Sequence, residues 1–361
     1  MVDGISMGSP LHKPSRRSRG SITIEHVARE AGVSAMTVSR VINKEPNVRA
    51  ETRRTVLETI ERLNYSPNTA ARNLAAGEAT HIGLLYSNPS AAYLSQFLVG
   101  ALEAARKAGS HLVIEPCESD DEAEKGEVSR RFANAEAEGV ILPPPLSESV
   151  PILTELALAN TPVVTVAMGK LYPNALNVRI DDFAAAKEMT DYLISLGHRR
   201  IALITGVQSH IAATERERGF RAAVAQAGLR SEDVAVEDGL FTFRSGLDAA
   251  EKLLDRQVPP TAIFASNDDM AAAVVSVAHR RGLEVPGDVT VVGFDDTAPA
   301  TTVWPELTTI RQPVSAMAAA AVDLLLADLR HRRSGSGALS QEMVLDHELI
   351  IRASSGPPKS D

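Results

Sequence analysis

The first hydrophobic pattern in the chain predicts two short helices joined by a tight turn. Apolar residues recur at helical spacing in a first stripe that consists of Ile24, Val27, Ala28 and Ala31. Gly32 favours a break after this stripe, because glycine adopts positive φ at little cost. Val38 and Val41 then form the inward side of a second helix.

Polar residues flank these stripes where helix ends need them. Thr23 and Ser34 are of the type that caps helix N-termini, and Glu25 places a negative charge in a first turn. The outward side of the second helix carries Ala35, Met36, Thr37, Ser39 and Arg40. Such a helix fits the DNA major groove, where Arg and hydroxyl groups reach base edges and phosphates. The pattern predicts a helix-turn-helix, with an ordinary surface helical hairpin as the alternative.

A third helix and a short fourth one are predicted next. Residues 50–63 have helical periodicity, with one apolar face made of Val56, Leu57, Ile60 and Leu63. Asn68 is a candidate cap for a helix over residues 69–76, which Gly77 ends. A helix of this length is marginal in water, so we expect it to act as a hinge that orders on binding.

From residue 80 onward, short apolar runs alternate with helical stretches. The predicted strands are Ile82–Tyr86, Leu112–Glu115, Val140–Leu142, Val163–Met168, Ile201–Thr205, Ala262–Ala265 and Val289–Phe294. The predicted helices are Ala91–Ala108, Ala184–Leu196, Thr214–Ala227, Gly246–Leu254 and Asp269–Arg281. This alternation predicts an α/β core of parallel sheets, and its length favours two Rossmann-like lobes. Neither a G-x-G-x-x-G turn nor a Walker A loop is present, so no nucleotide cofactor is expected.

Charge is divided unevenly along the chain. Residues 1–76 hold 12 Lys and Arg against 7 Asp and Glu, whereas residues 77–361 hold 25 against 39. The overall net charge of −9 therefore hides a basic head that suits phosphate. Cys117 is the only cysteine, and neither a secretory signal nor a long apolar run is present. We expect a cytoplasmic, DNA-binding protein.

Several short motifs in this order resemble the lactose-repressor (LacI/GalR) family of bacterial transcription regulators, over residues 21–352. The motifs are VAREAGVS (27–34), TVSRVIN (37–43), NYSPN (64–68), LGHR (196–199), Arg216 before Gly219-Phe220, SNDDM (266–270), VGFDD (292–296) and LTTIRQP (307–313). The resemblance implies an all-α helix-turn-helix headpiece, a hinge helix and a two-lobed core like periplasmic sugar-binding proteins. It also implies a homodimer, because the C-terminal leucine heptad of the family's tetramers is missing.

The expected domain boundaries follow from this resemblance. A disordered arm (1–20) precedes the headpiece (21–66), the hinge (67–78), the core (79–352) and a disordered tail (353–361). Lobe 1 is expected to comprise about residues 79–180 and 310–340. Lobe 2 is expected to comprise about residues 181–309 and 341–352.

The resemblance also assigns DNA contacts. Base-reading positions fall on Ala35, Met36 and Arg40, and phosphate or capping positions on Thr23, Ser34, Thr37, Ser39 and Asn43. The hinge would contribute Asn68, Ala71 and Leu74. Leu74 matches a leucine that wedges into the minor groove and kinks the duplex. Met36 is alternatively a packing residue.

Polar residues at the carboxyl ends of strands are the candidates for a small-molecule site. The resemblance implies ligand contacts for Arg216, Asp295 and Phe241, and strand ends add Asn267 and Asp181, the last preferred over Asp182. All five would come from lobe 2. Ser87, Asn88, Ser90 and Tyr93 would come from lobe 1, and Gln312 lies near a crossover. Each is alternatively a structural polar residue. Carboxylate, guanidinium, amide and aromatic groups together suit a sugar better than a flat apolar ligand.

The sequence thus favours a repressor of a carbohydrate-utilisation operon that a sugar-like effector releases from a palindromic operator. A corepressor-dependent regulator remains open. Two further classes of protein use the same core fold, periplasmic solute receptors and sugar-processing enzymes. The missing signal and the basic head argue against a receptor. No set of nucleophile, base and orienting group and no metal-ligand spacing supports an enzyme, so neither catalytic nor metal-binding residues are assigned.

Overall fold

The computed structural model describes residues 24–42, 48–63, 80–117, 121–135, 137–169 and 176–359. Contacts divide the chain into two compact units, Met1–Ala75 and Ala76–Asp361. Several predicted features lie outside the described residues: the arm, the hinge, Thr23, Asn43, Asn68, Ala71 and Leu74.

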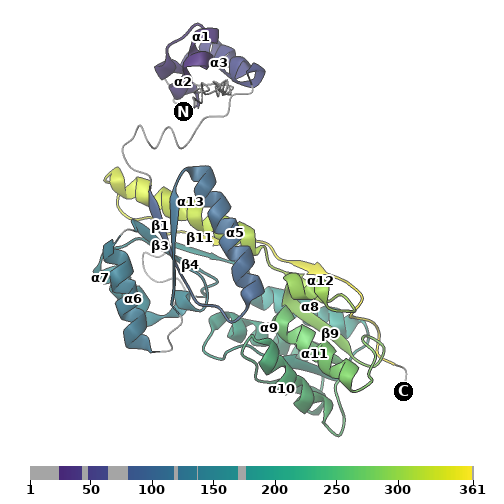
Figure 1. Cartoon of the computed structure of the whole chain (residues 1–361). Helices are drawn as coiled ribbons and strands as arrows, with labels where there is room; N and C mark the ends of the chain where they lie inside the picture. The colour runs from purple at the N-terminus through teal and green to yellow at the C-terminus, as the bar shows by residue number, and fades with distance from the viewer. Residues whose placement is uncertain are drawn as a thin grey trace, which may run out of the picture. The chain divides into compact units, whose positions relative to one another are not determined.

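The described part of the first unit contains three helices, drawn in purple in Figure 1. They are α1 (Ile24–Glu30), α2 (Ala35–Ile42) and α3 (Ala50–Arg62). Gly32, in the turn after α1, has φ +66°, and the Ser34 hydroxyl accepts a hydrogen bond from the backbone N–H of Thr37 at 3.2 Å. The predicted helix-turn-helix is confirmed, as is the third helix.

A small apolar core joins these helices. It consists of Val27, Ala28, Val38, Val41 and Val56. The prediction for Leu57 is wrong, because this side chain is 50% exposed. Thr59 is buried on α3 instead, and its hydroxyl donates to the carbonyl of Thr55 at 2.8 Å, which satisfies the polar group within the helix.

Lobe 1 of the second unit is a parallel sheet of six strands with helices on both faces (Figure 1). In spatial order the strands are β11 (Glu342–Val344), β5 (Leu176–Arg179), β4 (Val163–Val166), β3 (Gly139–Leu142), β1 (His81–Tyr86) and β2 (His111–Pro116). One face packs against α5 (Ala91–Ala108) and α13 (Val314–Arg333). The other packs against α6 (Glu122–Ala135) and α7 (Val150–Leu158), and a 3-10 turn, η1 (Leu146–Glu148), precedes α7.

Lobe 2 repeats the same design. Its strands are β12 (Glu348–Ile350), β10 (Thr308–Arg311), β9 (Thr290–Asp295), β8 (Ala262–Ala265), β6 (Ile201–Ile204) and β7 (Val234–Glu237). All pairs are parallel except β10 with β12. Helices α8 (Asp182–Ser195) and α9 (Ile211–Gln226) cover one face, and α10 (Phe243–Leu254) and α11 (Asp268–Arg280) cover the other. The short helix α12 (Ala298–Thr302) follows β9.

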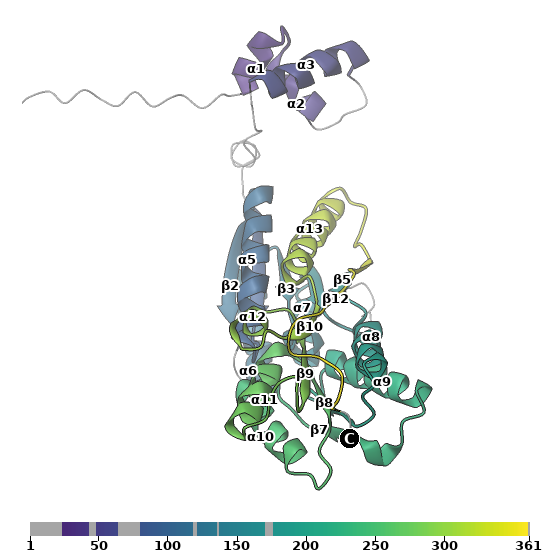
Figure 2. The ribbon, with the colours of Figure 1, turned by 90° about the vertical axis from the view of Figure 1, so that its right-hand side faces the viewer.

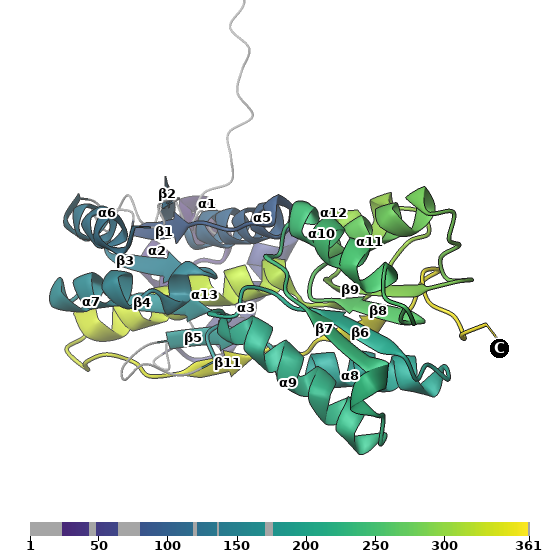
Figure 3. The same ribbon diagram turned by 90° about the horizontal axis from the view of Figure 1, so that it is seen from below.

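The seven strands and five helices predicted in this unit are all confirmed, with small shifts at their ends. Figures 2 and 3 show that α5 of lobe 1 and α11 and α12 of lobe 2 lie along one side of the unit. Within the described ranges, no helix is long and apolar enough to cross a membrane.

The chain passes between the lobes three times: between β5 and α8, between β10 and α13, and between β11 and β12. Lobe 2 was expected to hold residues 341–352. However, β11 belongs to lobe 1, because it pairs with β5. Glu342 on β11 also accepts a hydrogen bond from the side chain of Arg179 on β5 at 2.8 Å. Each lobe therefore receives its last strand from residues 342–350.

The expectation of a disordered tail from residue 353 is also wrong for the part that is described. Ser354 is fully buried, donates to the carbonyl of Val291 at 2.5 Å and accepts from the backbone N–H of Thr308 at 2.9 Å. Gly356 accepts a hydrogen bond from the Thr290 hydroxyl. The polar groups of this segment therefore form hydrogen bonds with β9 and β10 and are not simply exposed to solvent.

Candidate functional site

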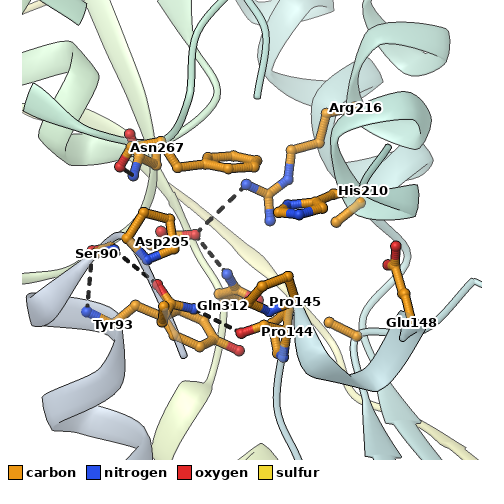
Figure 4. A pocket seen from close by; sticks show the side chains of 15 residues that line it. Ser90, Tyr93, Pro144, Pro145, Glu148, His210, Arg216, Asn267, Asp295 and Gln312 are labelled. Atoms are coloured by element: carbon orange, nitrogen blue, oxygen red, sulfur yellow. Dashed lines mark hydrogen bonds and ion pairs between the residues drawn. The ribbon is translucent and has the colours of Figure 1, made fainter. Parts of the chain in front are cut away.

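A small cavity of about 60 Å³, called the inner chamber below, lies between the two lobes. It lies beyond the carboxyl ends of the strands, where ligands bind in folds of this type. Figure 4 shows its side chains. Its lining residues are Asn88, Pro89, Ser90, Tyr93, Pro144, Pro145, Glu148, Ala167, His210, Ala212, Arg216, Phe241, Asn267, Asp295 and Gln312.

Arg216 is held in the inner chamber by its own lobe. It lies on α9 and is 5% exposed. Its Nε donates to Oδ1 of Asp182 at 2.8 Å, and Nη1 donates to the carbonyl of Ser266 at 2.6 Å. The guanidinium also stacks on the ring of Phe294, 3.6 Å from its centroid. These contacts fix the plane of the guanidinium without using all five donors, which leaves it able to bind a ligand oxygen.

Asp295 lies between Arg216 and Gln312, as Figure 4 shows. Its Oδ1 is 3.8 Å from Nη1 of Arg216 and accepts a hydrogen bond from Nε2 of Gln312 at 2.5 Å. Burial raises the pKa of this carboxyl to about 7, and Arg216 opposes the rise. Asp295 ends β9 with φ 108°, a strained conformation for a residue other than glycine. The backbone strain and the raised pKa both occur where a functional carboxylate would be needed.

Asn267 and Phe241 are fixed to one another. Asn267 caps α11, because its Oδ1 accepts from the backbone N–H of Met270 at 3.0 Å, and its Nδ2 donates to the carbonyl of Phe241 at 2.9 Å. Phe241 itself has φ 59°, and its ring lies against Gly206. A Cβ at Gly206 would come within 1.9 Å of that ring, so only glycine leaves room for the aromatic wall.

Lobe 1 contributes the start of α5. Ser90 caps this helix and donates a hydrogen bond across to Oδ2 of Asp269 in lobe 2, at 2.5 Å. Asn88 accepts from the backbone N–H of Ser90 at 2.8 Å and donates to the carbonyl of Pro144 at 3.0 Å. The buried hydroxyl of Tyr93 has no hydrogen-bond partner among the described residues. A buried group of this kind is costly, which is understandable if a ligand supplies the partner.

Glu148 makes a second contact between the lobes. Both of its carboxylate oxygens accept from the backbone N–H of Ile211, each at 3.1 Å, at the start of α9. A carboxylate at a helix N-terminus interacts favourably with the helix dipole. Burial nevertheless raises the pKa of Glu148 to about 7. His210 stacks on Phe241 beside it, and burial lowers the pKa of this histidine.

The outward side of α2 forms a second candidate surface. Met36 is 64% exposed, so it is not the packing residue that was the alternative. Arg40 is exposed, and Thr37 and Ser39 are half-buried. Ala35 packs partly against the headpiece core. An exposed apolar side chain beside a basic one and hydroxyls is the composition that major-groove recognition uses.

Comparisons with known proteins identify the family of the chain. A family model for bacterial regulatory proteins of the lacI family matches residues 23–68, and a model for a periplasmic binding protein-like domain matches residues 190–355. Catabolite control protein A of Priestia megaterium is 35% identical over 308 residues, which is 84% of this chain and 92% of that protein. This chain belongs to the lacI family. It is a DNA-binding transcription regulator, as are its relatives.

Another relative is the HTH-type transcriptional regulator CelR of Thermobifida fusca, 34% identical over 92% of this chain and 98% of that protein. The structure of a CelR–cellobiose complex matches this lacI-family chain with a TM-score of 0.69 at 31% identity, covering 92% of this chain and all of that one. The lac repressor dimer bound to operator and the anti-inducer ONPF matches with a TM-score of 0.68 at 27% identity, covering 93% and 99%.

The structure brings together most of the residues that were predicted to bind the effector of this lacI-family regulator. Eight of them line the inner chamber: Asn88, Ser90, Tyr93, Arg216, Phe241, Asn267, Asp295 and Gln312. Ser87 instead lines a neighbouring cavity. The preference for Asp181 is corrected, because Asp181 is exposed and caps α8, whereas Asp182 is buried against Arg216.

Sequence reasoning did not assign the other seven lining residues, Pro89, Pro144, Pro145, Glu148, Ala167, His210 and Ala212. Pro144 and Pro145 follow the strand β3, so the rule of strand ends could have found them. Glu148 lies on a 3-10 turn two residues before α7, where no periodic pattern marks it. In the part of the chain that is described, no group of three His, Cys, Asp or Glu residues could hold a metal ion.

Proposed function

We propose that this regulator represses a carbohydrate-utilisation operon, binding a palindromic operator as a homodimer, and that a neutral sugar-like effector releases it. As a chromosome-binding repressor it would act in the bacterial cytoplasm. The inner chamber carries the proposal, because both lobes direct hydrogen-bonding groups into it. Arg216, Asp295 and Asn267 are contributed by lobe 2, and Asn88 and the unpartnered hydroxyl of Tyr93 by lobe 1.

Charge supports a neutral effector over an anionic one. Asp295 and Glu148 line the inner chamber, and Asp182 lies directly behind Arg216. Burial keeps the pKa of His210 low, so this residue adds no positive charge at neutral pH. The charge of the guanidinium is therefore already paired by Asp182, and the acidic groups beside it offer no net positive charge to a phosphate or an acid. Hydroxyl groups can both donate to these carboxylates and accept from Arg216.

Exposed apolar surface supports the homodimer. On α5, Val99 and Leu102 are 51% and 47% exposed, and near α12 Trp304 is 77% exposed. A groove of about 720 Å³ beside Trp304 includes Phe243 and Val303. Val99 and Leu102 lie on α5, and Val303 and Trp304 directly follow α12; these two helices share one side of the core in Figures 2 and 3. A second copy related by a two-fold axis would cover both patches and would match a palindromic site.

The switch follows from the position of the effector between the lobes. A ligand that touches both lobes favours one relative orientation, and its leverage equals its difference in affinity for the two orientations. The hinge segment leads directly into β1, which begins at His81. Rotation of lobe 1 within the dimer would thus move the two hinge segments, and a marginal helix would form or melt accordingly.

Binding measurements test this proposal directly. An operator is first selected from random duplexes, and its release is followed by fluorescence anisotropy as candidate effectors are added. Neutral sugars should raise the thermal midpoint and release the operator, whereas sugar phosphates and sugar acids should do neither. An effector that tightens operator binding would identify a corepressor instead. Turnover of any sugar during incubation would indicate an enzyme.

A further inference from the structure

The chain enters the core at one edge of the lobe 1 sheet. The first described residue of the core is Thr80, and β1 begins at His81. His111 starts β2 beside His81, and its backbone N–H donates to the carbonyl of Thr80 at 2.9 Å. The parallel strands of both lobes direct their carboxyl ends to the cavity between the lobes. The starts of β1 and β2, called the amino edge below, therefore lie at one far end of the core.

Two helices end at the amino edge with basic residues. Their last turns hold five arginines and lysines: Arg106 and Lys107 on α5, and Arg330, Arg332 and Arg333 on α13. The side chain of Arg333 binds Glu138 just before β3 and lies 3.5 Å from the hydroxyl of Thr80, which places the end of α13 beside β1. Figures 1 and 2 show the ends of both helices at the same end of lobe 1. Cations in a last turn stabilise a helix, and here two helices bring them to one edge.

Much of this positive charge is not neutralised within the protein. Arg332 pairs with the buried carboxylate of Asp328 at 2.6 Å, and Arg333 pairs with Glu138. Three exposed side chains have no carboxylate partner among the described residues: Arg106, Lys107 and Arg330. Residues 77–361 hold 39 acidic residues against 25 basic ones. Unpaired cations at one end of such an acidic body indicate a surface for an anionic partner.

We propose that the amino edge is a second DNA-binding surface, which contacts the sugar-phosphate backbone in addition to the headpiece and irrespective of sequence. Arg106 and Lys107 on α5 and Arg330 on α13 pair with phosphates. The exposed rings of His81 and His111 are stacked, with centroids 5.4 Å apart, and even a neutral imidazole keeps one N–H for a phosphate oxygen. Double-stranded DNA suits such a surface, because it carries one negative charge per ~1.7 Å of its axis.

The connection of the chain favours DNA over other anionic partners. Residues 64–79 join the headpiece to Thr80, so a duplex that the headpiece binds is tethered to the amino edge and not to the opposite end of the core. A tether raises the local concentration of its partner, and weak phosphate contacts then add to the overall affinity. In a homodimer, two amino edges are tethered to the same duplex.

The salt dependence of DNA binding tests the proposal on the full-length protein. Fluorescence anisotropy measures the Kd for a selected operator and for a random duplex of equal length, between about 50 and 200 mM salt. Arg106→Ala/Lys107→Ala should weaken binding to both duplexes alike. The slope of log K against log salt should become shallower by about 2–4, because a dimer would lose up to four phosphate contacts of ~0.9 each. Arg330→Ala, on the other helix, should reduce the slope by about 1–2.

The matched control is Arg199→Ala/Arg256→Ala. These exposed arginines lie in the loops that lead into β6 and β8, at the far end of lobe 2, and they also have no carboxylate partner in the described part of the chain. The control removes the same charge and should leave the slope unchanged, because salt screens charges beyond a Debye length of ~10 Å. Thermal midpoints establish that all three variants remain folded.

Two outcomes would overturn the proposal. A slope of the folded Arg106/Lys107 variant equal to that of the control would exclude phosphate contacts and leave an acidic protein as the partner of this surface. A loss of affinity confined to the operator, with random DNA bound as before, would show that the substitution acts on sequence recognition through the headpiece. Neither result bears on the effector, since no small molecule is added in these measurements.

Discussion

Asp182 and Arg216 form a buried ion pair in which Oδ1 of the carboxylate accepts from Nε at 2.8 Å, with both side chains at most 10% exposed. Burial raises the pKa of Asp182 in spite of its partner. The pair is thus a positioning device: the carboxylate holds the guanidinium against Phe294 and points its remaining donors at the inner chamber.

Removal of the guanidinium should separate effector binding from DNA binding. Arg216→Ala should retain operator binding and lose the response to effector. It should also lower the free energy of unfolding by about 3–5 kcal/mol, because Asp182 is left buried and unpaired. The double variant Asp182→Asn/Arg216→Met removes both charges and should recover much of that stability but no effector response. Urea unfolding and operator-release assays measure the two effects. Loss of operator binding by a folded Arg216→Ala protein would show a structural role or a corepressor.

Glu148 should make stability depend on pH near neutrality. Burial raises its folded-state pKa from 4.5 to about 7, so the folded protein holds this proton more tightly than the unfolded chain. Its contribution to stability is fully present below about pH 4.5 and is lost as the pH rises through 7. Glu148→Gln should therefore be more stable than the wild type at pH 8 and nearly equal to it at pH 5, as urea unfolding measures.

The control for Glu148 is Glu155→Gln. Arg130 lowers the pKa of Glu155 by a hydrogen bond, so this carboxylate is ionised in both folded and unfolded chains above pH 6. Its variant should show no change in stability between pH 6 and pH 8 relative to the wild type. Equal pH profiles for the wild type and Glu148→Gln would mean that Glu148 titrates at its ordinary pKa.

Arg40 should carry sequence discrimination. Arg40→Ala should weaken operator binding by ~1–3 kcal/mol if the guanidinium reads a base with two hydrogen bonds, and should weaken binding to random DNA less. Arg54→Ala, whose side chain on α3 is 74% exposed, is the matched control, and it should reduce affinity for both duplexes alike or not at all. Equal losses on operator and random DNA would identify Arg40 as a phosphate contact.

Leu74 lies outside the described residues, and the expectation for it rests on the family resemblance. Leu74→Ala should weaken operator binding and reduce the bend in the operator while leaving nonspecific binding nearly intact, because the phosphate contacts remain. Gel-shift assays on circularly permuted operator fragments measure both affinity and bend. An unchanged bend with unchanged affinity would exclude a minor-groove wedge at this position.

Trp304 should be a main contact of the homodimer. Trp304→Glu should weaken dimerisation by about 2–4 kcal/mol, the range found for buried aromatic residues at the centre of interfaces. Leu158→Glu is a control with the same 77% exposure on a different face. Analytical ultracentrifugation measures the dimerisation of both variants. A Trp304→Glu protein that stays dimeric would show that the interface does not include Trp304.

The elements that were predictable from the sequence are those with a clear period. The buried runs of β1, β8 and β9 are bounded by polar residues, and those polar residues include Asp295 after β9 and Asn267 after β8. Parallel strands bring their carboxyl ends to one edge, so the site could be assembled without coordinates. Glu148 was missed because it contacts the site through the closeness of the lobes, which no local pattern encodes. His210 was missed because it lies in the loop between β6 and α9, where no periodic pattern marks it.

The errors also have physical causes. Asp181 and Asp182 are neighbours, and a one-residue difference in the start of α8 decides which caps the helix and which faces Arg216. Residues 314–333 form α13, the longest described helix, yet its alanine-rich sequence has no strongly one-sided apolar stripe because it is buried on several sides. Ser354 lies in a polar segment, and only tertiary hydrogen bonds reveal that it is ordered.

The three passages of the chain between the lobes affect how the protein is made. Each sheet receives an edge strand from residues 342–350, so neither lobe is a continuous stretch of sequence. Synthesis proceeds at about 5–20 residues per second. During translation both sheets must therefore wait for β11 and β12, with β5 and β10 exposed as unpaired edges until then. A premature stop between β10 and β11 would leave two incomplete lobes rather than one intact lobe.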